Sequence, residues 1–261
     1  MTDARPVRPT LVLLAAGAGL RFGGSKQLEP LGPNGELLLE YSIRDAQRAG
    51  FGKVVLVVRR EAQPRFAERL ETAAARMPIQ YAFQRDPLGT GHALLAATAA
   101  VDGPFAVANA DDHYGPSSFA ILADALASDD ERTDAWMVGF ELERTLSPHG
   151  PVARALCRRD DDDLLLGLEE HTAVSEGRSL VSMNLWGFRR PFLDALATRF
   201  DGFPGGGEFQ LPTEVSGRIA EEGFRVRVLP TSERWLGITW PDDRDWVREA
   251  LAASPGPWEH A

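Results

Sequence analysis

The feature that most constrains the fold is an alternation, over the first 110 residues, of short apolar runs with segments whose apolar residues recur at helical spacing. The apolar runs occupy residues 10–16, 53–58, 79–83 and 105–110. Short unbroken runs of this kind predict strands that are buried on both faces. The helical patterns between them occupy residues 37–50, 62–77 and 91–101. Strand and helix in alternation predict an α/β fold with a parallel sheet.

Parallel sheets bind their ligands beyond the carboxyl ends of the strands. Two segments of unusual composition follow predicted strands directly: the glycine-rich stretch 17–24, and the sequence NADDHYG, which begins at Asn109. We therefore expect these two segments to face one cleft.

The second half of the chain changes character. Strand-like pieces occupy residues 135–142, 151–159, 164–171 and 180–188, and they are followed by helical patterns at 190–200 and 211–223, a strand at 224–230 and a helix near 241–251. The four consecutive aspartates at 160–163 are typical of a solvated turn. The sequence has neither an internal repeat nor a linker rich in Gly, Pro or Ser. We predict a single domain over 1–261, with a nucleotide-binding half at about 8–130 and a sugar-phosphate-binding half at about 131–261.

Charge and composition exclude several classes of protein. The formal net charge of -10 and the pI near 5.1 argue against nucleic acid or an anionic membrane as a partner, since phosphates would be repelled except at a local basic patch. The single cysteine, Cys157, allows no intrachain disulfide. No run approaches the roughly 20 apolar residues of a membrane span, and the apolar run at 11–16 is short for a secretory signal. We expect a cytoplasmic protein, and nothing here indicates its oligomeric state.

The glycine-rich stretch combines a bare backbone with two cations. Glycines after a strand let several backbone N–H groups converge on an anion, and Arg21 and Lys26 supply positive charge beside them. The stretch lacks the third glycine of a dinucleotide fingerprint, where Phe22 stands instead, and it lacks the ending of a P-loop. By itself it indicates a phosphate site only weakly.

The chain resembles the nucleotidyltransferases that activate sugar phosphates, such as bacterial N-acetylglucosamine-1-phosphate uridylyltransferases and glucose-1-phosphate thymidylyltransferases. The resemblance rests on LAAGAGLRFGGSKQL and on QRDPLGTGHA, and it continues in order through NADDHYG, HGPVAR, LEEH and MNLWGF, and more loosely to GITWPDD. It implies a Rossmann-like nucleotide-diphospho-sugar transferase fold, in which helices flank a mixed, mostly parallel central sheet. It also implies an enzyme that transfers a nucleotidyl group from a nucleoside triphosphate to a sugar 1-phosphate and releases pyrophosphate.

The resemblance assigns the nucleotide site residue by residue. The triphosphate would lie on the backbone of Ala16, Gly17, Ala18 and Gly19. Arg21 and Lys26 would act in catalysis, because cations beside the phosphates stabilise the charge that moves onto the leaving pyrophosphate.

The base would meet Gln84, Gly89 and Thr90. An amide offers a donor and an acceptor to the edge of uracil or thymine, and we expect His92 of the same motif mainly to orient the loop. Uracil and thymine differ by one methyl group, which is worth only about 1 to 3 kcal/mol in discrimination. The choice between UTP and dTTP therefore stays open.

Asp111 is the predicted ligand of Mg2+, because it follows a buried strand and a carboxylate there can share the ion with phosphates and water. Its neighbour Asp112 suggests an alternative, the acidic motif of metal-dependent glycosyltransferases, although that motif normally spaces its two acids by one residue. Relatives supply a second ligand after the last strand, where Gly237 or Thr239 stands here. We name Asp242 for that role; its alternative role is to begin a helix.

On the acceptor side, Gly150, Glu170 and Asn184 match positions that contact the sugar in relatives. A carboxylate and an amide suit sugar hydroxyls. Because residues alternate across a strand, only one of Glu169 and Glu170 can face the cleft.

Two alternative functions stay open: a related enzyme that activates another phosphorylated alcohol, as cytidylyltransferases do, and a non-catalytic sensor of nucleotide or sugar phosphate. The bifunctional uridylyltransferases carry a long repetitive C-terminal domain, which does not follow here before Ala261, so no acetyltransferase activity is expected.

Overall fold

The chain folds around one nine-stranded mixed sheet. The computed structural model describes residues 7–17, 26–177, 179–253 and 256–258. The main path of the sheet runs in the order β10-β6-β9-β4-β1-β2-β3, and β7 joins it through β9 and carries β8. The strands are β1 (Thr10–Leu14), β2 (Lys53–Val58), β3 (Ile79–Phe83), β4 (Phe105–Asn109), β6 (Ala135–Glu141), β7 (Val152–Arg159), β8 (Leu165–Val174), β9 (Leu180–Phe188) and β10 (Val226–Thr231).

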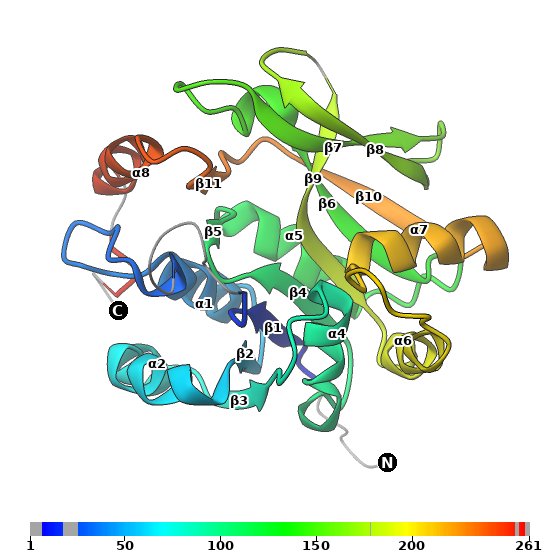
Figure 1. Cartoon of the computed structure of the whole chain (residues 1–261), viewed down its shortest axis with the longest axis horizontal. Helices are drawn as coiled ribbons and strands as arrows, with labels where there is room; N and C mark the ends of the chain where they lie inside the picture. Colours follow the sequence, from blue (N-terminus) through cyan, green and yellow to red (C-terminus); the bar gives the residue numbers. More distant parts are fainter. Residues whose placement is uncertain (1–6, 18–25, 178, 254–255, 259–261) are drawn as a thin grey trace.

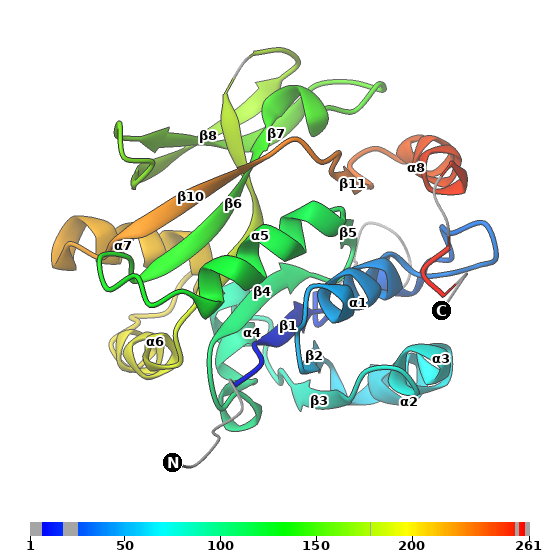
Figure 2. The same ribbon diagram turned by 180° about the vertical axis from the view of Figure 1, so that it is seen from behind.

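Helices cover both faces of the sheet (Figures 1 and 2). They are α1 (Leu38–Arg48), α2 (Gln63–Arg69), α3 (Glu71–Ala74), α4 (Thr90–Leu95), α5 (Pro116–Ala127), α6 (Pro191–Asp201), α7 (Leu211–Glu222) and α8 (Asp243–Ala252). Short 3-10 turns lie at Lys26–Leu28, Arg60–Ala62, Thr98–Ala100 and Leu142–Arg144. The predicted α/β fold with a mixed, mostly parallel sheet is confirmed. Helix α5 follows Gly115 and was not among the predicted helices.

Side chains of β1 alternate between two cores. Leu11 and Leu13 pack with α1, α2, α3 and α5 on one face, whereas Val12 and Leu14 pack with α4, α6 and α7 on the other. Because both faces are covered, β1 is apolar at consecutive positions, which is the pattern that predicted it.

The carboxyl ends of the parallel strands meet at one edge. Leu14 at the end of β1 lies opposite Val57 of β2 and Asn109 of β4. The backbone N–H of Ala110 donates to the carbonyl of Leu14 at 3.1 Å. The described start of the glycine-rich stretch, at Gly17, therefore follows β1 at the sheet edge where NADDHYG follows β4.

The sheet becomes mixed at β9. This strand is antiparallel to β4 on one side and to β6 on the other, and it continues into a pairing with β7. The β7–β8 hairpin extends away from the central sheet (Figure 1). Its tip returns to β10, where the backbone N–H of Val228 donates to the carbonyl of Asp163 at 2.8 Å.

The four aspartates at 160–163 form the tip of this hairpin. The carboxylate of Asp160 accepts from the backbone N–H groups of Asp162 at 3.0 Å and Leu164 at 2.8 Å. Their role as a turn, predicted from the sequence, is confirmed.

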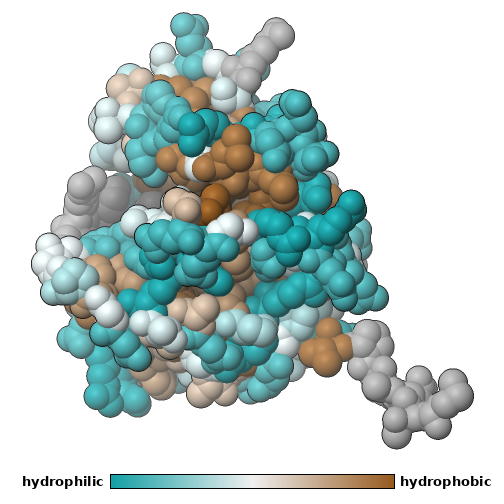
Figure 3. Space-filling model, turned by 90° about the vertical axis from the view of Figure 1, so that its right-hand side faces the viewer, coloured by the Kyte–Doolittle hydropathy of each residue, from teal (hydrophilic) through white to brown (hydrophobic). Residues whose placement is uncertain are grey.

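Apolar side chains also reach the surface. On the face shown in Figure 3 they gather into a patch that hydrophilic side chains surround. Among the described residues, the large apolar side chains that are exposed are Val7, Leu166 and Trp240. None of the helices in the described ranges has the length and apolar character needed to cross a bilayer.

The C-terminal segment is attached to the sheet edge through Asp243. This residue is fully buried at the start of α8. One carboxylate oxygen accepts from the backbone N–H groups of Thr239 at 2.8 Å and Trp240 at 2.7 Å, and the other accepts from Ser147 Oγ at 2.5 Å and contacts His149 Nδ1 at 3.0 Å. Burial alone would raise the pKa of Asp243, but these hydrogen bonds hold it below the ordinary value.

We predict that Asp243→Asn lowers the free energy of unfolding by about 2 to 3 kcal/mol. Both carboxylate oxygens of Asp243 accept hydrogen bonds, and asparagine would replace one of these acceptors with an NH2 group that faces other donors. Urea unfolding followed by circular dichroism measures the change. The matched control is Asp242→Asn, since Asp242 is exposed one residue earlier, and it should change stability by less than about 0.5 kcal/mol. Equal losses in the two variants would contradict the anchoring role of Asp243.

Candidate active site

A cavity of about 240 Å³ lies where β9 crosses from the central sheet to the β7–β8 hairpin. It brings together two of the predicted acceptor residues, Glu170 and Asn184. Its lining consists of Asn109, Asp112, Ala153, Arg154, Ala155, Leu168, Glu170, Ser182, Met183, Asn184 and Pro212. The third predicted acceptor residue, Gly150, does not line it.

Strand register explains why these residues meet. Ala155 of β7 lies opposite Glu170 of β8 and opposite Ser182 of β9, so the three side chains share one face. Glu169 extends from the other face and its carboxylate lies 3.9 Å from Arg158 Nε. As expected, only one of the two glutamates faces the cavity.

Asn184 lies at an irregularity of β9. The register between β6 and β9 shifts between Met137 and Gly139, and Asn184 has φ +61°. Asparagine tolerates this left-handed conformation better than most residues do, and a bulge changes the direction of a side chain. The irregularity thus accounts for a polar side chain at the cavity within an otherwise buried strand.

Asp112, rather than Asp111, lines the cavity from the edge of the sheet. The chain turns at Asp111 and then forms the short strand β5 (Asp112–His113). Asp112 is 7% exposed, and one of its carboxylate oxygens accepts from Asn109 Nδ2 at 2.9 Å and from the hydroxyl of Tyr114 at 3.2 Å. Burial, and after it the charge of Asp112, raises the pKa of Tyr114 well above its usual range, so this hydroxyl stays a donor.

The segment expected to supply a second metal ligand contains a short strand that pairs directly with β5. In β11 (Leu236–Gly237), Gly237 lies opposite Asp112. A Cβ at position 237 would come within 2.3 Å of the Trp235 ring, so this backbone position accepts no side chain while Trp235 occupies that space. Asp242 is exposed and immediately precedes α8, and its role as a metal ligand stays a prediction.

Gln84 directly follows β3 and holds the predicted base-reading loop. Its amide nitrogen lies 3.1 Å from the carbonyl of Gly89 and 3.2 Å from His92 Nδ1. These contacts engage the amide nitrogen, so the amide oxygen is the group that Gln84 can offer to a base. The ring of His92 also lies 3.1 Å from the carbonyl of Asp86, which fits the loop-orienting role expected for it.

The same loop is bonded to the segment before α7. The backbone N–H of Phe209 donates to Leu88 at 2.6 Å, and the N–H of Gly91 donates to Phe209 at 2.9 Å. Gly89 has φ +103°, and a Cβ there would lie 2.6 Å from the carbonyl oxygen of Phe209. Glycine is therefore required at position 89 by this close approach, whatever its role toward a base.

Thr90 links the loop to α7. Its hydroxyl donates to Gln210 Oε1 at 2.8 Å and accepts from the N–H of Leu211 at 2.9 Å, which satisfies one donor at the start of the helix. Phe209 and Gln210 were not predicted from the sequence. The only local signal was the segment GEFQLP, whose partners lie about 120 residues away.

The glycine-rich stretch is described only at its beginning. Ala16 is buried and its carbonyl accepts from Arg59 Nε at 3.2 Å, whereas Gly17 is exposed. Ala18, Gly19 and Arg21 lie outside the described residues, and of Lys26 only the backbone is described, at the start of a 3-10 turn. Arg59, which directly follows β2, is therefore a cation beside Ala16, and it was not predicted from the sequence.

Gly150 lies against the C-terminal segment. A Cβ at this position would be 3.4 Å from the Trp240 ring, and its φ of +154° favours glycine. Trp240 is 41% exposed, so the Gly150 backbone and an exposed aromatic ring lie together.

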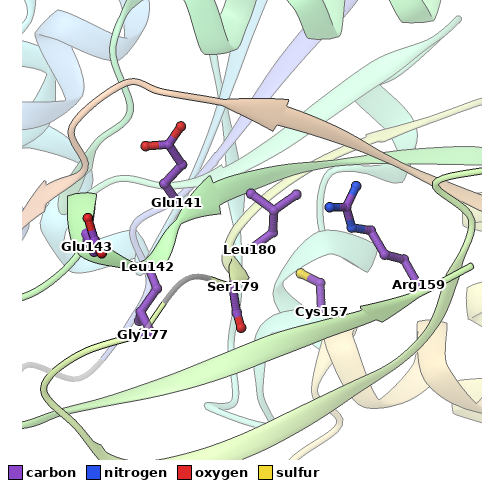
Figure 4. Close-up of a pocket in the computed structure, with 8 residues that line it drawn as sticks. All are labelled: Glu141, Leu142, Glu143, Cys157, Arg159, Gly177, Ser179 and Leu180. Carbon is purple, nitrogen blue, oxygen red and sulfur yellow. The ribbon is translucent and has the colours of Figure 1, made fainter. Parts of the chain in front are cut away.

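A second cavity, of about 550 Å³, contains none of the predicted residues (Figure 4). Glu141, Leu142 and Glu143 line one side of it, and Cys157 and Arg159 of β7 line another. Burial raises the pKa of Cys157 to about 12, so its sulfur is a neutral thiol near pH 7 rather than a nucleophilic thiolate.

Comparisons with known proteins identify the family. Residues 11–183 match the family model described as a MobA-like NTP transferase domain. Two curated relatives are named bifunctional protein GlmU. The relative from Symbiobacterium thermophilum is 30% identical over 254 residues, which cover 93% of this chain and 50% of the relative. The relative from Syntrophotalea carbinolica is 27% identical over 259 residues, which cover 92% of this chain and 50% of the relative. The chain thus spans about half the length of these relatives.

Solved structures share the fold. An inositol-1-phosphate CTP transferase from T. maritima superposes with a TM-score of 0.74 at 16% identity, over 94% of this chain and 96% of that one. A UDP-glucose pyrophosphorylase in complex with UDP-glucose superposes with a TM-score of 0.70 at 16% identity, over 94% of this chain and 99% of that one. Since the family model covers well over half of the sequence, the chain belongs to the MobA-like NTP transferase domain family, a family of nucleotidyltransferase enzymes.

Proposed function

We propose that this chain transfers a nucleotidyl group from a nucleoside triphosphate to a sugar 1-phosphate. The observation that carries the proposal is the cavity that joins Glu170 and Asn184 to the end of β4, at the edge where β1 enters the glycine-rich stretch. An acceptor in this cavity would lie beside the site that the sequence predicts for the triphosphate. A solved structure with the same fold, a UDP-glucose pyrophosphorylase, supports the same reaction class.

In the proposed reaction, an oxygen of the acceptor phosphate attacks the α-phosphorus of the triphosphate. The new P–O bond forms as the bond from the α-phosphorus to the bridging oxygen of pyrophosphate breaks, and pyrophosphate leaves with its electrons. A sugar phosphate is already anionic at neutral pH, so no general base is required. The contribution of the protein is to align the two anions and to hold cations beside the leaving group, the role we assign to Arg21 and Lys26.

The acceptor site offers groups suited to a sugar. Glu170 and Asn184 extend a carboxylate and an amide into the cavity, and Ser182 adds a hydroxyl. Such groups accept from and donate to sugar hydroxyls with defined directions. Gly150 does not line the cavity, but its backbone, next to Trp240, would contact the sugar from outside it.

For the base we propose UTP or dTTP as the preferred donor, read by Gln84 together with the backbone of Gly89 and Thr90. The structures that share the fold include both a UDP-glucose pyrophosphorylase and an inositol-1-phosphate CTP transferase. The CTP enzyme acts on an inositol phosphate, which is the observation that favours the second candidate, transfer to a phosphorylated alcohol other than a sugar. Both reactions would run in the cytoplasm, where nucleoside triphosphates are available.

Magnesium fits the oxygen ligands at the edge of the sheet. In the described ranges no cluster of three or more acidic, His or Cys side chains could enclose a metal, but Mg2+ bound with phosphates needs only one or two carboxylates from the protein. We propose Asp111 as the ligand, with Asp242 as the second. When bound, the ion would offset the negative charge of the phosphates and polarise the α-phosphate.

The proposal predicts that the purified chain, incubated with Mg2+, a nucleoside triphosphate and a panel of sugar 1-phosphates, releases pyrophosphate and forms the corresponding nucleotide sugar. Turnover with UTP or dTTP should exceed turnover with purine nucleotides. Coupled detection of pyrophosphate and mass spectrometry of the product measure the two outcomes. Turnover with polyol phosphates in place of sugar phosphates would support the second candidate, whereas nucleotide binding without turnover on either panel would indicate a sensor.

The metal assignment predicts a difference between adjacent aspartates. Asp111→Asn removes a charge from a half-buried turn residue and should lower kcat at least about 100-fold with little change in stability. Asp112→Asn disturbs the buried contacts to Asn109 and Tyr114, so it should lower thermal stability and have the smaller effect on kcat. The measurement is kcat against Mg2+ concentration beside a thermal melt. A larger loss of kcat in Asp112→Asn than in Asp111→Asn would instead identify Asp112 as the metal ligand.

A further inference from the structure

Arg59 directly follows β2, at the carboxyl edge of the sheet. The pairing of β2 with β3 continues past the ends of the strands, since the backbone N–H of Gln84 donates to the carbonyl of Val58 at 3.1 Å. On the other side, Arg59 Nε donates to the carbonyl of Ala16 at 3.2 Å. Arg59 therefore lies between Ala16, which we assign to the triphosphate, and Gln84, which we assign to the base.

The side chains of this row extend from one face of the sheet. The preceding residues of the row lie side by side in register and pack into the core that includes α4: Leu14, Val57 and Ala82. Side chains alternate along an extended chain, so Ala16, Arg59 and Gln84, each two positions further on, share that face. Arg59 itself is extended, with φ -76° and ψ 143°. The loop that Gln84 holds through Gly89 leads into α4 on the same face.

The guanidinium of Arg59 keeps donors for a ligand. Arginine has five N–H donors, and within the described ranges Arg59 uses the one on Nε and forms no ion pair. The residue is half-buried. The sequence from Gly17 to Lys26, directly after Ala16, contains two cations and no acid. Four N–H groups on the two terminal nitrogens are therefore left, and such a fork matches the oxygens of a phosphate.

A bound nucleotide has to pass over the end of β2. Its base is assigned to Gln84 and Gly89, after β3, and its triphosphate to Ala16 and Gly17, after β1. The part of the molecule between the base and the outer phosphates is the ribose with its α-phosphate. Of these two groups the phosphate carries the charge, and a half-buried cation at short range favours it.

We propose that Arg59 binds the α-phosphate of the nucleotide. This inference rests on the proposed function, because it uses the positions of the base and the triphosphate assigned there. The α-phosphate is the phosphate that the reaction keeps in the product. Arg59 thus holds the triphosphate before transfer and the nucleotide sugar after it, whereas Arg21 and Lys26 act on the departing pyrophosphate.

The test separates phosphate binding from base binding in the full chain. Isothermal titration calorimetry with Mg2+ gives the affinities for UMP, dTMP, CMP and pyrophosphate, and NMR titration gives the affinities for the corresponding nucleosides. Arg59→Met should weaken binding of the best-bound monophosphate at least about tenfold. Binding of its nucleoside and of pyrophosphate should stay within about twofold, because neither contains the α-phosphate. Arg59→Lys keeps the charge without the fork and should lie between the wild type and Arg59→Met.

The matched control is Arg60→Met. Arg60 is the next residue, is exposed, and has its guanidinium carbon 4.1 Å from the centroid of the Phe83 ring, which packs on the opposite face of the sheet. This variant removes the same charge and should leave all affinities within about twofold. If Arg59→Met does not fold, Arg59→Gln is the second variant. Its amide can still donate to the carbonyl of Ala16 without the charge, and the same selective loss for the monophosphate is expected.

Four results would overturn the assignment. The first is wild-type affinity for the monophosphate in Arg59→Met, or in Arg59→Gln where Arg59→Met does not fold. The second is equal weakening for nucleoside and monophosphate, which would mean that Arg59 only shapes the site. The third is equal weakening for pyrophosphate, which would place Arg59 at the leaving group. The fourth is an equal effect of Arg60→Met, which would indicate the general field of the charges.

Failure of the proposed function is a separate observation. A wild-type chain that binds a nucleoside monophosphate through Arg59, yet releases no pyrophosphate with any nucleotide and sugar phosphate, would keep the Arg59 assignment and remove nucleotidyl transfer. A wild-type chain that binds none of the three monophosphates would overturn the role of Arg59 itself.

Discussion

The placement of β9 between β4 and β6 is the constraint on which the candidate site depends. Its C-terminal part is locked by aromatic packing, because Trp186 and Phe188 are fully buried and stack at 6.1 Å, and Phe188 stacks on Phe192 at 3.9 Å. A shift by one residue would turn these rings to the opposite face, so the register is strongly specified. With the register fixed, Ser182 and Asn184 reach the cavity.

The second organising contact joins the two halves of the molecule. Phe209, Gln210 and Leu211 bond to the loop at residues 88–91 through four hydrogen bonds, two between backbone groups and two that involve the Thr90 hydroxyl. The next residue, Pro212 of α7, lines the acceptor cavity. The segment at residues 209–212 therefore connects the loop assigned to the base with the cavity assigned to the acceptor. A displacement of the loop would also displace Phe209 and the start of α7, because the backbone at Gly89 packs so closely against Phe209 that there is no room even for a Cβ atom.

Much of the fold was predictable because its signals are local. The apolar runs gave the strands, and the helical spacing gave all the long helices except α5. The family was evident from two glycine-containing motifs. Which acid faces the cavity was not predictable, because Asp111 and Asp112 are separated only by a turn whose direction depends on the distant pairing of β5 with β11. The assigned roles of the site residues stay predictions.

The charge of the chain bears on how it handles anionic substrates. With a net charge of -10, the protein as a whole does not attract phosphates. Recognition must come from a few cations held at short range, where screening by salt is weak. Arg59 is a described cation of this kind, because its Nε donates to the carbonyl of Ala16, directly before the glycine-rich stretch. A side chain that the backbone already holds loses little entropy if it binds a phosphate. We therefore expect this acidic chain to prefer small phosphorylated ligands over nucleic acid.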